Sequence, residues 1–242
     1  MRDWLTARPI AHRGLHDAAA SIIENTPSAF RAAIAGGHGI ECDLQISADG
    51  EAMVHHDDAL GRLTDGEGRL DTMTAAALKR VAFKGTTDRM LTLGELCDLV
   101  DGRTTLVIEL KGAFAGDTRL ATRTASVLAS RTGPIAAMSF DPGLMAAVRP
   151  LSPSLTLGLV GMRRDPNAPE TARMPALRYL QRMFAARLQF LAYRVQDLGT
   201  LPPLLARHVA GWPVLTWTIR TDDDRARAAR QADQIIFEGF RP

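Results

Sequence analysis

Short apolar segments that alternate with helical patterns are the feature that most restricts the fold of this chain. Eight of them begin near residues 10, 40, 105, 135, 156, 190, 213 and 234, and most are followed by a helix-like stretch. Such alternation is typical of parallel strands joined by crossover helices, and eight of these units close into a barrel. We therefore predict an α/β fold, a TIM-type (β/α)8 barrel, as a single domain over residues 1–242.

An open doubly wound sheet is the competing architecture. A sheet of that kind would carry a glycine-rich phosphate-binding turn after its first strand. The residues at that point are His12-Arg13-Gly14, which do not form such a turn. The barrel is therefore the preferred fold.

One additional strand interrupts the alternation. Residues 40–46 alternate apolar and polar side chains, which is the period of a strand, and a turn signal follows at Asp49-Gly50. Residues 52–54 return too soon for a parallel crossover, which needs about a dozen residues, so we expect an extra antiparallel β-hairpin strand after strand 2. A simple register places residue 43 opposite residue 54 and His56 near Glu41, whereas a bulge would exchange His56 for His55.

Composition narrows the class of protein. Hydrophobic residues make up 46% of the chain, and 29 basic against 27 acidic residues leave a net charge of only +2. This balance gives no reason to expect a nucleic-acid partner. No apolar run reaches the roughly 18 residues of a membrane helix, and the N-terminal residues lack the apolar region of a signal peptide. We expect a cytoplasmic protein without stable membrane insertion.

Function in a barrel of this type lies at the carboxyl ends of the strands. Polar or aromatic residues at these ends are His12, Arg13, Glu41, Asp43, Glu109, Lys111, Arg163, Arg164, Trp217, Arg220 and Glu238. Glu41 and Asp43 are two positions apart on one strand, so both point to the same face. The hairpin brings His56 back toward this rim.

These residue types favour phosphoryl chemistry. The carboxylates of Glu41, Asp43 and Glu109, from two different strands, could hold Mg²⁺ or Ca²⁺, which prefer oxygen donors. The histidine side chain in general titrates near neutral pH, so His12 and His56 are candidates for exchanging protons as acid and base. Cationic side chains beside them would neutralise an anionic oxygen.

Several of the same residues have a purely structural interpretation. We interpret His16, His38, His55 and His208 as structural, and Asp57 as a turn carboxylate that could also orient His56. The default place of Trp217 is the barrel core. Arg163 and Arg164 fit a solvated loop, although either could contact a phosphate, and Glu238 and Arg220 fit either interpretation.

Short motifs along nearly the whole chain resemble the glycerophosphodiester phosphodiesterase family. In order they are His12-Arg13-Gly14, Glu24-Asn25-Thr26, Ile40-Glu41-x-Asp43-Leu44, Asp49-Gly50, His56-Asp57, Ile108-Glu109-Leu110-Lys111, Ser139-Phe140 and Trp217-Thr218. The run from His12 to Asp57 is the most specific of them. The resemblance implies a phospholipase C-like barrel that hydrolyses glycerophosphodiesters to glycerol 3-phosphate and an alcohol.

The resemblance also assigns roles to individual residues. It implies that His12 and His56 are the general acid/base pair, and that Glu41, Asp43 and Glu109 bind one divalent metal. Substrate-binding residues would then be Arg13, Lys111 and Trp217. Many relatives end their last strand with Thr-Asp, whereas this chain has Phe237-Glu238, and the segment from 57 to 91 is short. Both differences bear on the alcohol group that is accepted.

Two alternatives come from the same residues. Cleavage in the manner of lysophospholipase D or sphingomyelinase D needs an apolar groove, and the visible rim residues are mainly polar. A non-catalytic barrel that only binds glycerophosphodiesters would be indicated by a missing histidine or metal carboxylate, and none is missing.

Overall fold

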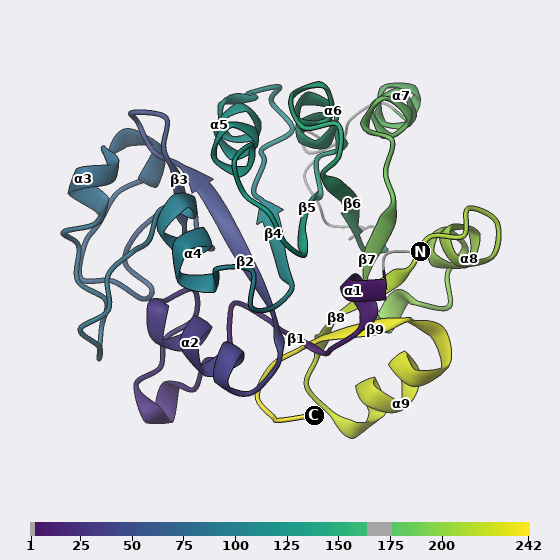
Figure 1. Cartoon of the computed structure of the whole chain (residues 1–242), viewed down its shortest axis with the longest axis horizontal. Coiled ribbons are helices and arrows are strands. Elements are labelled where there is room, and N and C mark those ends of the chain that lie inside the picture. Colours follow the sequence, from purple (N-terminus) through teal and green to yellow (C-terminus); the bar gives the residue numbers. More distant parts are fainter. Residues whose placement is uncertain (1–2, 164–175) are drawn as a thin grey trace.

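The computed structural model describes residues 3–163 and 176–242, and its centre is a closed barrel of eight parallel strands (Figure 1). The barrel strands are β1 (Ile10–Ala11), β2 (Gly39–Ile46), β4 (Leu106–Leu110), β5 (Ile135–Ser139), β6 (Thr156–Gly161), β7 (Phe190–Arg194), β8 (Val214–Ile219) and β9 (Gln234–Phe237). Closure occurs at β1, which pairs in parallel with both β2 and β9. The predicted fold class is therefore confirmed.

The extra strand β3 (Ala52–Val54) lies outside this ring and pairs antiparallel with β2. The predicted register was wrong by one residue, because Val54 faces Leu44 and the His55 amide donates to the Asp43 carbonyl at 3.0 Å. The reason is the turn. Gly50 has a φ of +80°, and the Ser47 amide bonds the Glu51 carbonyl, so the loop contains three residues instead of two.

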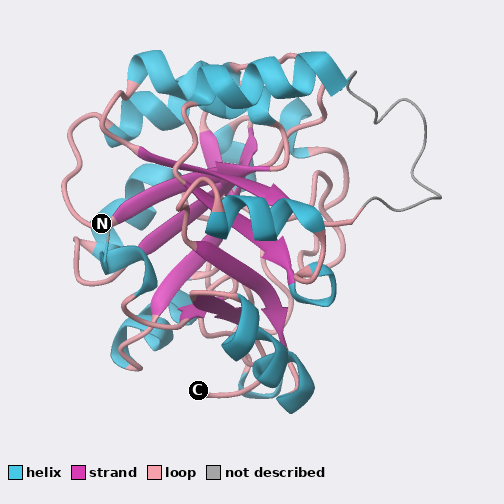
Figure 2. Ribbon diagram, turned by 90° about the vertical axis from the view of Figure 1, so that its right-hand side faces the viewer, coloured by secondary structure: helices cyan, strands magenta, loops and turns pink. Residues whose placement is uncertain are grey.

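Helices surround the barrel on its outer side (Figures 1 and 2). They are α1 (Asp3–Thr6), α2 (Pro27–Ala35), α3 (Ala75–Leu78), α4 (Leu93–Val100), α5 (Arg119–Leu128), α6 (Pro142–Leu151), α7 (Ala176–Ala186), α8 (Leu201–His208) and α9 (Asp222–Gln231), together with short 3-10 turns at Ala18–Ala20, Leu70–Thr72 and Val195–Asp197. Their starts follow local chemistry, since Pro27 occupies the first turn of α2 and Thr92 with Glu95 forms a capping box on α4. No helix in the described ranges is long and apolar enough to cross a bilayer.

Three apolar clusters hold the fold together. The largest lies between the strands and the helices, and a second fills the barrel interior around Val107, Phe190 and Ile236. Leu5 of α1 belongs to the interior cluster, so this short helix covers one end of the barrel. The third cluster lies beneath the segment from 57 to 91, around Met53 and Phe83, and gives that segment a small core of its own.

Candidate active site

Three carboxylates from two neighbouring strands meet at the carboxyl end of the barrel. Glu41 and Asp43 lie on β2, Glu109 lies on β4, and the pairing register sets Asp43 beside Glu109. Their residues are 1%, 1% and 7% exposed, and each offers an oxygen within 4.8 Å of the others. Burial, followed by the charges of Asp43 and Glu109, raises the pKa of the Glu41 carboxyl well above its ordinary value. A divalent cation fits this donor set, because it would balance closely spaced negative charge with hard oxygen ligands.

Two cationic side chains face the same carboxylates. The Lys111 ammonium lies 2.8 Å from Asp43 Oδ1 and 2.7 Å from Glu109 Oε1, and Arg13 Nε lies 3.2 Å from Asp43 Oδ2. Burial would raise the pKa of the Asp43 carboxyl, but the charges of Lys111 and Arg13 outweigh it, so that pKa is lowered. Asp43 is therefore held as the carboxylate at neutral pH.

A buried asparagine fixes the orientation of Asp43. Asn25 Nδ2 donates to Asp43 Oδ2 at 2.9 Å, and the Asp43 amide donates to Asn25 Oδ1 at 3.3 Å. Asn25 has a φ of 57°, a left-handed conformation that asparagine tolerates better than most residues. Its role was not predicted from the residue pattern, although Glu24-Asn25-Thr26 is one of the motifs of the family resemblance.

His12 is held by a carboxylate from the last strand. Its Nδ1 donates to Glu238 Oε2 at 2.6 Å, while its Nε2 lies 4.0 Å from Glu41 Oε2. Arg220 binds both oxygens of Glu238 at 3.1 and 3.2 Å. Burial would raise the pKa of Glu238, but hydrogen bonds from His12 and Arg220, together with the nearby ring of His16, outweigh it and lower that pKa. The ring of His12 therefore presents Nε2, not Nδ1, to the carboxylates of β2.

A matching arrangement holds His56. His56 Nδ1 donates to Asp57 Oδ1 at 2.7 Å, and Arg62 Nε donates to Asp57 Oδ2 at 2.6 Å. Arg62 also binds Glu24 at 2.7 Å, and Glu24 binds Arg13 at 2.7 Å. Each candidate acid/base histidine thus bonds a carboxylate that is itself bound by an arginine, and a chain of ion pairs connects His56 to Arg13.

One cavity of about 340 Å³ contains most of the predicted residues. Its polar lining is His12, Arg13, Glu41, His56, Glu109, Lys111, Thr218 and Arg220, and its apolar lining is Met138, Phe140, Val160, Met162, Trp217 and Ile236. Trp217 packs edge-on against Phe140 with 5.7 Å between the ring centroids. The site is therefore less polar than the sequence indicated, because strand-end apolar residues form part of its wall.

The other four histidines are not among the described residues that line this cavity. His55 is buried beside Phe83, His38 packs edge-on against Phe237, and His208 is exposed at the end of α8. His16 forms an ion pair with Glu238, with 3.9 Å between His16 Nε2 and Glu238 Oε2.

The pair Arg163-Arg164 is only partly described. The amide of Arg163 donates to Asp197 at 2.9 Å, which places its backbone against the loop after β7. Arg164 lies outside the described residues.

Comparison with known proteins identifies relatives of this chain. Curated relatives include a glycerophosphodiester phosphodiesterase of Caldanaerobacter subterraneus, 35% identical over 43% of this chain and 45% of the relative. The bovine glycerophosphodiester phosphodiesterase 1 is 44% identical over 33% of this chain and 23% of the relative. The aligned regions thus span less than half of either relative.

Solved structures show the same fold over nearly the full length. A phosphodiesterase of Oleispira antarctica, in complex with the product sn-glycerol-3-phosphate, superposes with a TM-score of 0.77 at 22% identity, covering 97% of this chain and 94% of that one. A glycerophosphodiester phosphodiesterase of Thermotoga maritima gives 0.71 at 23% identity, covering 94% and 92%. The sequence pattern of one family matches residues 12–237, from the residue that follows β1 to the end of β9. By that match, the chain belongs to the glycerophosphoryl diester phosphodiesterase family.

Proposed function

We propose that this protein hydrolyses glycerophosphodiesters to glycerol 3-phosphate and an alcohol with the help of one divalent metal ion. The observation that carries the proposal is a single cavity lined by His12, His56, Glu41 and Glu109, with the Asp43 carboxylate within 4.8 Å of the two glutamates. Family membership supports the reaction class. The Oleispira antarctica relative, crystallised with sn-glycerol-3-phosphate, supports the product.

Glu41, Asp43 and Glu109 would hold the metal, either Mg²⁺ or Ca²⁺. When bound, the ion supplies positive charge for the phosphoryl oxygens. Arg13 and Lys111 lie beside the same carboxylates and are the proposed contacts of the substrate phosphate.

Proton transfer is assigned to the two histidines. Because each Nδ1 donates to a carboxylate, each Nε2 is available to exchange a proton with the substrate. One histidine takes the proton of the attacking hydroxyl group, either of water or of the substrate's own glycerol. Attack by the glycerol hydroxyl releases the alcohol and leaves a cyclic phosphate, which a water molecule must then open to give glycerol 3-phosphate. The other gives a proton to the alcohol oxygen as the phosphorus–oxygen bond breaks. Glu238 and Asp57 orient the two rings.

The apolar wall favours a second candidate reaction at the same site. Met138, Phe140, Val160 and Met162 line the cavity with Trp217, which is the proposed contact of the glycerol moiety. This surface suits a substrate that carries an acyl chain, as in lysophospholipase D or sphingomyelinase D cleavage. Comparing lysophosphatidylcholine with glycerophosphocholine as substrates separates the two reactions.

The purified protein should release glycerol 3-phosphate from glycerophosphocholine or glycerophosphoethanolamine. EDTA should abolish this release, and added Mg²⁺ or Ca²⁺ should restore it. Binding without turnover of any of these diesters, with metal supplied, would identify a non-catalytic barrel. Undiminished release in EDTA from protein without bound metal would refute the metal role. A cytoplasmic location remains a proposal from the sequence.

A further inference from the structure

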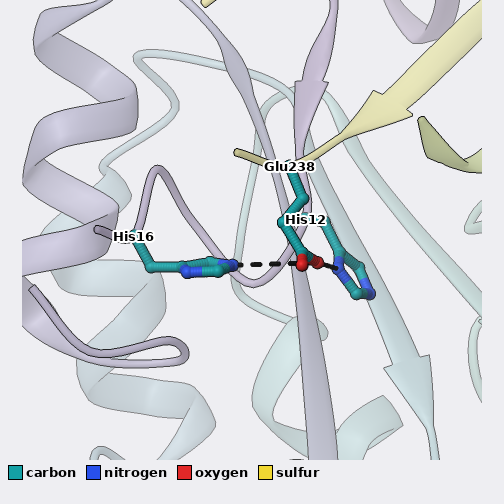
Figure 3. A group of neighbouring side chains, drawn as sticks. All are labelled: His12, His16 and Glu238. Atoms are coloured by element: carbon teal, nitrogen blue, oxygen red, sulfur yellow. Dashed lines mark hydrogen bonds and ion pairs between the residues drawn. The ribbon is translucent and has the colours of Figure 1, made fainter. Parts of the chain in front are cut away.

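A second group of possible metal ligands lies next to the carboxylate site. His12 follows β1, His16 lies in the loop beyond it, and Glu238 follows β9. Figure 3 shows both imidazole rings turned toward the Glu238 carboxylate. One ligand atom from each of the three residues lies within 4.8 Å of the other two. Residues far apart in the chain thus present two nitrogens and one carboxylate to a common point.

The Nε2 atom of His16 lacks a hydrogen-bond partner in the described part of the chain, although it is buried. Its ion-pair partner is Glu238, whose Oε2 atom lies 3.9 Å away. The side chain as a whole is 19% exposed, so the ring lies close to solvent. A buried polar atom without a partner is unfavourable, and a bound cation would provide that partner.

The donor set selects a different metal from that of the carboxylate site. Mg²⁺ and Ca²⁺ prefer oxygen ligands only, whereas two imidazole nitrogens with one carboxylate are the ligands of many catalytic zinc ions. We propose that His12, His16 and Glu238 form an inhibitory Zn²⁺ site, distinct from the site of Glu41, Asp43 and Glu109.

Neighbouring charges decide whether a cation can bind. Arg220 competes for Glu238, but its side chain is 55% exposed, and ion pairs of exposed side chains contribute little free energy. The guanidinium of Arg13 is already bound to Glu24 and Asp43. Glu41, 4.0 Å from His12 Nε2, adds negative charge on the other side of the ring. A divalent cation at this site would therefore displace Arg220 from Glu238 and bind the Glu238 carboxylate in its place.

Occupation of the site would stop proton transfer by His12. A neutral imidazole carries one proton, which here lies on Nδ1 and is donated to Glu238. If Zn²⁺ takes the Nδ1 lone pair, that proton must move to Nε2, so Nε2 can no longer accept one from the substrate. The inhibition, though not the binding itself, rests on the proposed function.

The test is a calorimetric titration of Zn²⁺ into protein saturated with Mg²⁺, followed by the effect of Zn²⁺ on hydrolysis. Variants are His16→Gln, the matched surface control His208→Gln, and Glu109→Gln, which removes a ligand of the carboxylate site only. We expect one Zn²⁺ site in the wild type, His208→Gln and Glu109→Gln. In His16→Gln we expect binding at least about tenfold weaker, given the ~10–100-fold losses seen when metal-site groups are removed.

Inhibition of hydrolysis by Zn²⁺ should differ among the variants in the same way as Zn²⁺ binding. The His16→Gln variant should keep its basal turnover and need at least about tenfold more Zn²⁺ for half inhibition, in line with the affinity change. Equal Zn²⁺ binding by His16→Gln and the wild type would overturn the proposal, as would loss of binding in Glu109→Gln alone. If the protein hydrolyses none of the diesters, the titration still decides whether the site exists.

Discussion

Asn25 is the residue whose removal tests most directly how the carboxylate site is held. It is 1% exposed, and its side chain makes two hydrogen bonds to Asp43. A hydrogen bond to a charged group contributes about 1.5–3 kcal/mol, and a neutral one about 1 kcal/mol. The Asn25→Gly variant keeps the left-handed backbone conformation but loses both bonds, so we expect a loss of about 2–4 kcal/mol. That is a large part of the roughly 5–15 kcal/mol by which a protein is stable.

A second substitution at the same position separates side-chain and backbone effects. Asn25→Ala also loses both hydrogen bonds, and it places a Cβ at a φ of 57°. The left-handed conformation costs roughly 1–2 kcal/mol for a residue with a Cβ. We therefore expect the alanine variant to be less stable than the glycine variant by about 1 kcal/mol, after the lower chain entropy of unfolded alanine is counted.

Urea unfolding in the metal-free state measures these differences as shifts of the midpoint at constant slope. Ser21→Gly is the matched control, because Ser21 is exposed and has the same φ of 57°. By the same arithmetic it should be more stable than the wild type by at most about 1 kcal/mol, and it should not be less stable. A double-mutant cycle of Asn25→Gly with Asp43→Asn should give a coupling of about 0.5–3 kcal/mol. Wild-type stability of Asn25→Gly, or purely additive effects, would refute the reasoning.

The other predictions concern the two histidines. His12→Ala and His56→Ala should each lose turnover while still binding the divalent metal in a calorimetric titration, and near wild-type turnover in either would contradict its role. Burial would raise the pKa of Asp57, but hydrogen bonds from Arg62 and then His56 outweigh it and lower the pKa to about 2. A lowered pKa stabilises the fold above the unfolded value near pH 4 and stops doing so as the pH falls through about 2. Asp57→Asn should therefore melt a few °C below the wild type at pH 7, for a loss of about 1 kcal/mol, and the gap should close near pH 2. An equal gap at both pH values would contradict the ion-pair explanation.

Local patterns account for most of the fold that could be predicted. The strand starts, the capping box of Thr92 and Glu95 and the existence of the hairpin all depend on nearby residues. The register of that hairpin could not be predicted, because it depends on whether Gly50 is counted in the turn or in the strand. Helix α1 was not predicted, since its four residues are too few to show a helical period.

The residues of the candidate site likewise include some that local sequence patterns predict and some that they do not. Glu41 and Asp43 could be paired because strand side chains alternate, and Glu109 follows from the end of the next barrel strand. The contacts of Glu238 and Arg62 could not be assigned. Glu238 reaches His12 only because the barrel closes, and Arg62 reaches Asp57 and Glu24 only because its loop is packed on a small core. Apolar wall residues such as Met138 could not be distinguished from core residues by sequence.

Because the barrel closes at β1, the site has two parts that differ in how far apart in the sequence their residues lie. The three carboxylates lie between residues 41 and 109, whereas His12 and Glu238 are 226 residues apart. Contacts of such different sequence separation differ in the chain entropy lost when they form. Any opening between β1 and β9 would separate His12 from Glu238 but leave β2 and β4 joined. The ability to bind a metal and the ability to turn over a substrate would then belong to different cooperative units of the same barrel.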